Sequence, residues 1–291
     1  MPVELLSESE RAKLSRFPEE IPREDLRHYF TLSEEDRDAA GRLYGDANPL
    51  GFALALSALR YLGFFPPDLT DVPEEAAGYV ADQIGARPNV LEEYGTRAQT
   101  TRKHKRQAIE HLGFRRLESK EDRERVRSWL VERALEHDRP SVLIETLCEK
   151  LRRERIVRPG ITVIERMVAT ARREAHEESL RRLSPLLTAE RKSLLDRLLV
   201  PENPGERTPL GWLRRHATAN SPRALLEVLD KVRQLQRWGV PGWDLSALNP
   251  NRQKMLARLG RKYTNQALQR MGPERSEEHT SELQSLAHIS Y

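Results

Sequence analysis

The sequence has 291 residues, of which 38% are hydrophobic, 32% charged and 6% aromatic, enough for one large domain or two to three small ones. Its net charge of +4 is mildly basic and does not by itself select a class of partner. The single cysteine, Cys148, excludes an intramolecular disulfide and a cysteine-rich zinc site, and it fits a reducing cytoplasm.

Hydrophobic residues recur at helical spacing along nearly the whole chain, and the alternation expected of strands is absent. Leu, Ala, Arg and Glu, which favour helices, dominate these segments. We therefore predict an all-α fold of multi-helix subdomains with helix-turn-helix-like elements. The predicted helices begin at Ser7, at residue 23 (to 30) and after Ser33, and then span residues 50–63, 71–85, 99–112, 121–137, 141–155, 162–183, 189–199, 210–216, 224–238 and 251–270.

Several predicted helix starts carry capping signals. Ser7 with Glu10, and Thr162 with Glu165, have the spacing of a capping box, in which two side chains satisfy free amide groups of the first turn. Ser33 and Thr188 are predicted to act as N-caps.

The most apolar stretch, residues 50–65, is interrupted by Arg60 and bracketed by prolines. It is too short and too broken to span a bilayer, so it predicts a buried core helix and no membrane association. The start of the chain is acidic and lacks the apolar core of a signal peptide, so we expect a cytoplasmic protein.

The pattern divides the chain into four parts. Residues 1–117 are predicted to form a helical DNA-binding subdomain, for which the basic residues described below are the reason, and residues 118–199 a second helical, helix-turn-helix-like subdomain. Residues 201–209, rich in Pro, Gly and Glu, are the best linker candidate, so 200–272 would hold a linker and the start of a further helical region. The run RSEEHTSELQS from Arg275 resembles translated sequencing-library adapter, and we expect 273–291 to be a non-native tail.

The first of three basic clusters lies on the predicted helix 99–112 and contains no acid between residues 97 and 106. Arg102, Lys105 and Arg106 share a helix face at spacings of three and four. Neutralising DNA phosphates releases counterions, so an unbalanced basic face favours duplex DNA over a merely solvated face. Hydroxyls and amides add phosphate or base contacts. The candidate contacts are Arg97, Thr100, Thr101, Arg102, Lys103, Lys105, Arg106 and Gln107.

The second cluster follows Lys150 and leads through a turn into the predicted helix at Thr162. Two helices joined by a turn resemble a helix-turn-helix, whose second helix presents its N-terminal residues to the major groove. The turn is longer than in the compact motif, and taken alone an ordinary helical hairpin is the favoured interpretation. The candidate contacts are Arg152, Arg153, Arg155, Arg158 and Thr162.

The third cluster comprises Arg252, Lys254, Arg258, Arg261 and Lys262. The last four can share one helix face. That face either contacts phosphate or is solvated, and we favour the solvated interpretation.

Enzyme motifs are absent from the sequence. It has no phosphate-binding loop, no His-Glu-x-x-His and no Gly-x-Ser-x-Gly elbow. His104 and His111 could share a helix face, but two histidines without a third ligand do not indicate zinc. Most acids alternate with Arg or Lys, which is typical of solvated faces. We therefore expect no catalytic residue, no metal site and no cofactor in this chain.

Several stretches, in this order, resemble the N-terminal region of the Tn-three family of replicative bacterial transposases. They are LRHYFTLSEED from Leu26, NPLGFALALSALRYLGFF from Asn48, YGTRAQTTRKHKRQAIEHLGF from Tyr94, and RPGITVIER from Arg158 with LLTAERKSLLDRLL from Leu186. Their order and spacing are more specific than any single piece. The family often has an arginine-rich stretch before the second motif, where this chain has Arg42-Leu43-Tyr44-Gly45.

The resemblance implies that this region binds double-stranded DNA and recognises the terminal inverted repeats of the transposon. In this family a separate C-terminal domain carries an Asp-Asp-Glu triad that binds magnesium and cuts and joins strands. We therefore expect a chain cut off before that domain, which binds DNA without cutting it. Any self-association would belong to the full-length protein.

Two other classes of protein stay open. In a protein-interaction or dimerisation module, the basic faces would pair with acidic surfaces of another subunit, and the region after Leu210 could serve this purpose even beside DNA binding. A stand-alone helical DNA-binding regulator would need no further domain.

Overall fold

A computed structural model describes residues 5–96, 98–203, 205–216, 221–264 and 267. Apart from two strands of two residues each, the regular structure of these residues is helical, which confirms the all-α prediction. By their contacts the residues form two units, residues 1–133 with 139–171, and residues 134–138 with 172–291. Within the described ranges, no helix is long and apolar enough to cross a membrane.

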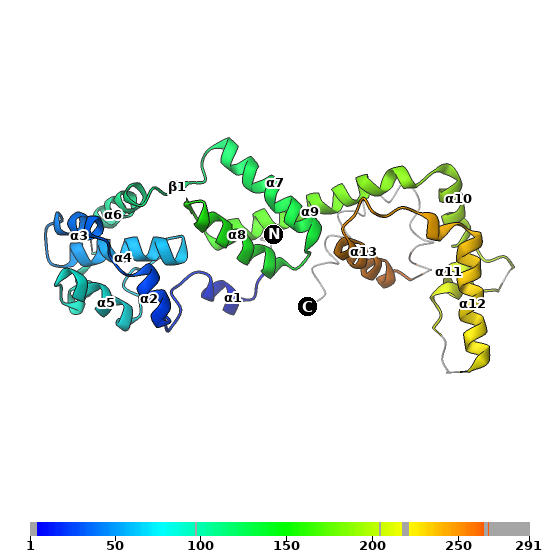
Figure 1. The fold of residues 1–291 in the computed structure, drawn as a ribbon, viewed down its shortest axis with the longest axis horizontal. Helices are drawn as coiled ribbons and strands as arrows, with labels where there is room; N and C mark the ends of the chain where they lie inside the picture. Colours follow the sequence, from blue (N-terminus) through cyan, green and yellow to red (C-terminus); the bar gives the residue numbers. More distant parts are fainter. Residues whose placement is uncertain (1–4, 97, 204, 217–220, 265–266, 268–291) are drawn as a thin grey trace. The chain divides into compact units, whose positions relative to one another are not determined.

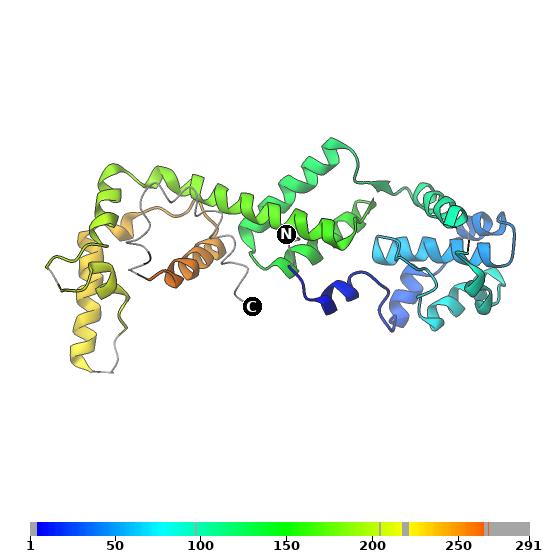
Figure 2. The same cartoon turned by 180° about the vertical axis from the view of Figure 1, so that it is seen from behind.

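The first unit is built around α4 (Ala47–Leu62). Every residue of α4 from Leu50 to Leu59 is buried, because the helix is apolar on all sides and neighbours cover each of them. Gly63 ends it in a left-handed conformation (φ 75°), which glycine adopts without steric cost. The helices around α4 (Figures 1 and 2) are α2 (Arg23–Tyr29), α3 (Glu34–Gly41), α5 (Glu74–Ile84), the 3₁₀ helix η1 (Pro88–Glu93) and α6 (Ala98–His111).

The remaining elements that begin in the first unit are α1 (Glu8–Lys13), β1 (Arg115–Arg116), α7 (Lys120–Glu136), α8 (Pro140–Arg153), β2 (Ile156–Val157) and α9 (Ile161–Leu183). The strands, which the sequence did not predict, pair in parallel, with Arg115 opposite Ile156. A parallel pair forms between residues distant in the chain, so no local alternation announces it. This pair joins the end of α6 to the end of α8 across the predicted boundary at residue 117, and the subdomain boundaries stay a prediction.

Three of the four predicted N-terminal caps are confirmed. Ser7 and Ser33 form capping boxes, and Thr188 accepts a hydrogen bond from the Arg191 amide. The predicted box of Thr162 and Glu165 is wrong. The helix α9 already begins at Ile161, with the Gly160 carbonyl accepting the first hydrogen bonds, and Glu165 is buried against the N-terminal segment instead.

The second unit contains the end of α9, the 3₁₀ helix η2 (Ser184–Leu186), α10 (Ala189–Arg197), α11 (Pro209–Arg214), α12 (Pro222–Arg237), the 3₁₀ helix η3 (Val240–Gly242) and α13 (Pro250–Lys262). The Leu210 amide donates to the Leu198 carbonyl at 3.0 Å, across the predicted linker. Residues 273–291, the predicted non-native tail, lie outside the described residues.

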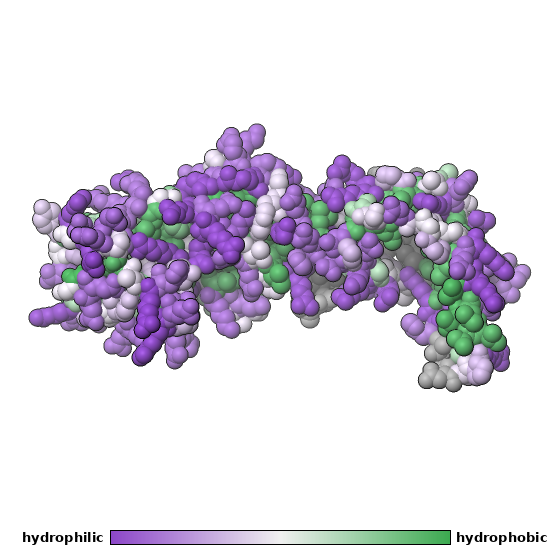
Figure 3. All heavy atoms as spheres, viewed as in Figure 1, coloured by the Kyte–Doolittle hydropathy of each residue, from purple (hydrophilic) through white to green (hydrophobic). Residues whose placement is uncertain are grey.

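One face of α12 exposes large apolar side chains (Figure 3). Leu225 is 61% exposed and Leu226 58%, and Val228, Leu229 and Val232 are each more than 40% exposed. This continuous apolar face is larger than the scattered single hydrophobic residues that a solvated surface normally carries.

Candidate nucleic-acid interface

The predicted DNA-binding helix α6 packs one face against α4. His104 and Ala108 are buried there, and the His104 and Phe52 rings form a T-shaped contact with centroids 6.0 Å apart. Because side chains advance by 100° per residue around a helix, the residues two positions before and after His104 point away from α4.

Three cations occupy that outward face: Arg102, Lys103 and Arg106, which we call the α6 cationic face. All three are exposed, and Arg106 retains 71% of its side-chain accessibility. Among the described residues, its one ion pair is with Glu110 at 3.9 Å, and neither Arg102 nor Lys103 forms any. A solvated pair at that distance contributes little, so these charges remain available to an anionic partner.

Lys105 does not lie on the α6 cationic face, although helical spacing predicted it there. Its Nζ lies 5.6 Å from the centroid of the Phe65 ring and 3.4 Å from the Pro66 carbonyl oxygen. Burial lowers the pKa of this lysine. The cause is tertiary: the segment after α4 returns beside α6 and covers its side chain, which leaves Lys103 to complete the exposed set.

The polar candidates on α6 are partly covered too. Thr100, Thr101 and Gln107 are half-buried. The Thr101 hydroxyl oxygen and the Gln107 Oε1 are buried without a hydrogen-bond partner in the part of the chain that the structure describes. Arg97, the first predicted contact, lies outside the described residues.

The second predicted cluster is occupied by its own neighbours. Glu149 accepts hydrogen bonds from Arg152 (2.7 Å) and from Arg153 (2.8 Å). These two arginines lower the pKa of Glu149. Lys150 pairs with Glu154, and the Arg152 guanidinium lies 5.1 Å from the Tyr29 ring centroid. Of Lys150, Arg152 and Arg153, only Arg153 keeps most of its side chain exposed, at 77%.

Arg155 and Arg158 have structural roles. Arg155 is exposed, has a left-handed backbone (φ 53°), and donates to the Leu112 carbonyl at the end of α6. Arg158 is only 5% exposed, because its guanidinium stacks 3.7 Å from the Phe64 ring centroid and donates to the Leu14 carbonyl. A side chain held this way cannot reach a phosphate without leaving the core. Thr162 is exposed on the first turn of α9.

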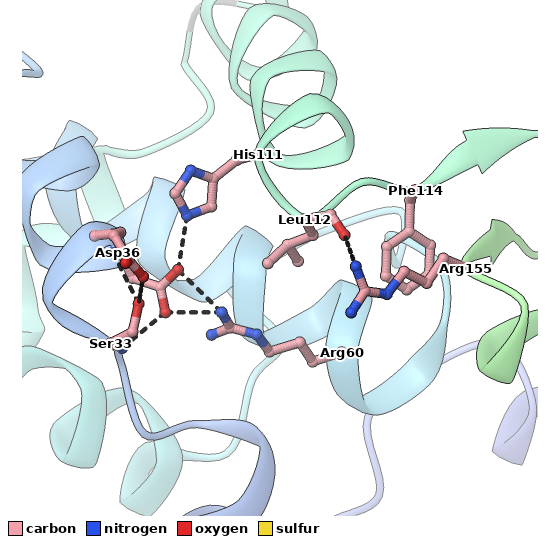
Figure 4. A pocket seen from close by; sticks show the side chains of 8 residues that line it. Ser33, Asp36, Arg60, His111, Leu112, Phe114 and Arg155 are labelled. Atoms are coloured by element: carbon pink, nitrogen blue, oxygen red, sulfur yellow. Dashed lines mark hydrogen bonds and ion pairs between the residues drawn. The ribbon is translucent and has the colours of Figure 1, made fainter.

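A cleft of about 440 Å³ lies between α3, the end of α6 and Arg155 (Figure 4). At its wall the buried Asp36 carboxylate accepts hydrogen bonds from the Ser33 amide, Arg60 and His111, the last at 2.8 Å. Burial would raise the pKa of Asp36, but these three donors together lower it. The carboxylate is therefore ionised, and it binds Arg60 near the end of α4 and His111 at the end of α6.

The third basic cluster lies on α13. Lys254, Arg258, Arg261 and Lys262 are exposed as predicted for a helix face, whereas Arg252 is 2% exposed and donates to the Ser179 hydroxyl at 2.8 Å. Within the described residues, no group of three or more His, Cys, Asp or Glu side chains is placed to hold a metal ion.

Residues 5–171 match the family described as "Domain of unknown function (DUF4158)". The chain is also similar to three transposases: that of transposon Tn1546 from Enterococcus faecium (30% identical, covering 89% of this chain and 26% of the relative), that of Tn501 from Pseudomonas aeruginosa (31%, 93% and 27%), and that of Tn21 from Escherichia coli (30%, 93% and 27%). The chain therefore spans about a quarter of the length of these relatives.

Proposed function

The chain belongs to the family described as Domain of unknown function (DUF4158), and from this premise we propose that it is the DNA-binding N-terminal region of a Tn-three family transposase. Its role would be to recognise the terminal inverted repeats of the transposon in the cytoplasm. The α6 cationic face carries this proposal, because its three exposed cations include two that form no ion pair with any described residue.

The relatives' remaining three quarters would hold the catalytic domain, and with it the magnesium ions. The chain itself would bind duplex DNA without cutting it and would need no cofactor for binding. Its function would be to position the transposon end for the catalytic domain.

Fluorescence anisotropy of the chain on two duplexes across a salt series tests the proposal. One duplex carries a transposon end and the other a scrambled sequence. We expect tighter binding to the transposon end, with three phosphate contacts at the α6 cationic face contributing about −2.7 to the slope of log K against log salt. Equal weak binding to both duplexes would remove the specificity, and no binding even at low salt would remove DNA as the partner.

The exposed apolar face of α12 favours a second function in protein–protein contact. The exposed Leu225, Val228 and Val232, together with the half-buried Leu235, follow the alternating three- and four-residue spacing of a coiled-coil seam. We propose that this face serves self-association of the longer protein. Removing residues 200–291 should then abolish association, measured by analytical ultracentrifugation, while DNA binding survives. Loss of DNA binding in the same truncation would contradict the assignment of the DNA interface to the first unit.

A further inference from the structure

Three residues, Gly51, Tyr94 and His104, connect α6 to the central helix. The Tyr94 ring lies against the backbone of α4 at Gly51, where an added Cβ atom would come within 2.2 Å of the ring carbons. The hydroxyl of Tyr94 pairs with His104 Nδ1 at 3.1 Å, and the two rings stack at 13° with centroids 5.8 Å apart. The absence of a side chain at Gly51 thus leaves room for the Tyr94 ring, and the Tyr94 hydroxyl is the hydrogen-bond partner of His104.

This connection is buried and uncharged. Tyr94 is 6% exposed and His104 is 3% exposed. Burial raises the pKa of the Tyr94 phenol, and burial together with the neighbouring Lys103 charge lowers the pKa of His104. Both groups are therefore neutral near pH 7, and the hydrogen bond is a directional constraint between neutral partners. Losing one partner would leave the other buried and unsatisfied.

The constraint acts on the rotation of α6 about its own axis. His104 lies about 200° around the helix from both Arg102 and Arg106, since each residue advances the side chain by about 100°. Lys105, which directly follows His104 and lies about 100° around the helix from it, is already half-buried. A rotation of α6 that released His104 would therefore carry cations from the exposed face towards the bundle.

We infer that Tyr94 and His104 are positioning residues for DNA binding: their hydrogen bond fixes the rotation of α6, so that Arg102, Lys103 and Arg106 reach phosphates together without either positioning residue touching DNA. The inference rests on the proposed function of α6. It means that the binding surface, which consists of charged residues, depends on two uncharged residues buried behind it.

The test compares two variants of the full chain that each lose one tyrosine hydroxyl. Tyr94→Phe keeps the ring over Gly51 but removes the bond to His104. Tyr79→Phe, on α5, removes a hydroxyl that forms a hydrogen bond of 2.9 Å with the Thr31 hydroxyl. Binding to mixed-sequence duplex DNA is measured by anisotropy across a salt series, and helix content by circular dichroism.

We expect Tyr94→Phe to weaken binding by about threefold to tenfold, the effect of losing one net hydrogen bond, and to make the log–log salt slope shallower by about one, the share of a single phosphate. Helix content should stay at the wild-type level, and Tyr79→Phe should bind as the wild type does. Neither exchange alters charge, so a shallower slope reports that existing cations have moved away from phosphates.

His104→Leu reaches the same hydrogen bond from its other end and carries the test if Tyr94→Phe does not fold. His104→Asn offers an amide oxygen near the position of Nδ1, and we expect it to restore the wild-type slope. Wild-type affinity and slope in both Tyr94→Phe and His104→Leu would overturn the positioning role. The alanine variant of Arg102, Lys103 and Arg106 separates the two ideas: if it also binds like the wild type, the proposed function fails, and if it alone loses binding, only the positioning role fails.

Discussion

The outer face of α6 and the end of α8 are both rich in arginine and lysine, yet they differ in what those side chains contact. On α6, Arg102 and Lys103 point to solvent and form no ion pair within the described ranges. At the end of α8, Glu149 holds two arginines and Glu154 holds Lys150. Basic composition therefore does not define an interface; the acids at neighbouring helical positions decide whether the charge is available.

The largest effect should come from removing the α6 cationic face. The triple alanine variant of Arg102, Lys103 and Arg106 should weaken DNA binding at low salt by about 10²–10³-fold and make the salt slope shallower by about 2.7, because three phosphate contacts are lost. Anisotropy across a salt series measures both quantities. The matching triple alanine variant of Lys150, Arg152 and Arg153 is the control. A larger loss in the control than in the α6 variant would reverse the comparison.

Removing a buried arginine of the second region should affect stability instead of DNA binding. Arg158→Ala loses the stack on Phe64 and leaves the Leu14 carbonyl without its donor, so we expect the free energy of unfolding to fall by about 2–4 kcal/mol. Urea unfolding measures this, and the salt slope of DNA binding below the transition should be unchanged. Arg153→Ala, at an exposed position, should cost less than about 0.5 kcal/mol. Equal costs would show that Arg158 is not a structural residue.

Acid should loosen the α6 region before it loosens the end of α8. Burial lowers the pKa of His104 below its ordinary value of about 6.5, so the unfolded chain binds more protons below that pH. The contribution of His104 to stability is complete above about pH 6.5 and is lost as the pH falls towards its folded-state pKa. Glu149 has a lowered pKa, and its contribution is lost only as the pH falls through that lower value.

Urea unfolding measures this difference when the wild type and His104→Asn are compared from about pH 7.5 to about pH 5, the interval that contains the ordinary pKa of histidine. Over this interval the free energy of unfolding should fall further for the wild type than for the variant. The difference between these two decreases should be smaller than the loss expected for Arg158→Ala. Parallel pH profiles would show that His104 is not held neutral by its surroundings.

The smallest effect is expected from a substitution that frees the arginines at the end of α8, so that they resemble those on α6. Glu149→Gln releases Arg152 and Arg153 from their ion pairs, so DNA binding should tighten by about twofold to threefold, the range of a surface ion pair. The exposed Glu132→Gln on α7 removes the same charge and serves as the control for net charge. If both variants tighten binding equally, long-range charge explains the gain and the released arginines do not.

The sequence predicted most helices of the described residues because their signals are local. The capping boxes at Ser7 and Ser33 and the apolar run of α4 depend on residues within a few turns of one another. The pairing at the end of α8 was not predicted, although it too has a local signal, since Glu149 stands three and four residues before its arginines. The same local spacing explains why Arg106 has a single weak partner at Glu110.

By itself, then, the sequence determined the all-α class, the position of the core helix and the basic character of α6. Tertiary structure decided which cations are exposed: Phe65 and Pro66 cover Lys105, and Phe64 covers Arg158. It also decided the parallel pair of β1 and β2 and the contact of Tyr94 with Gly51. The physical reason is that helix formation depends on neighbours in the chain, whereas burial depends on which distant segment packs against each face.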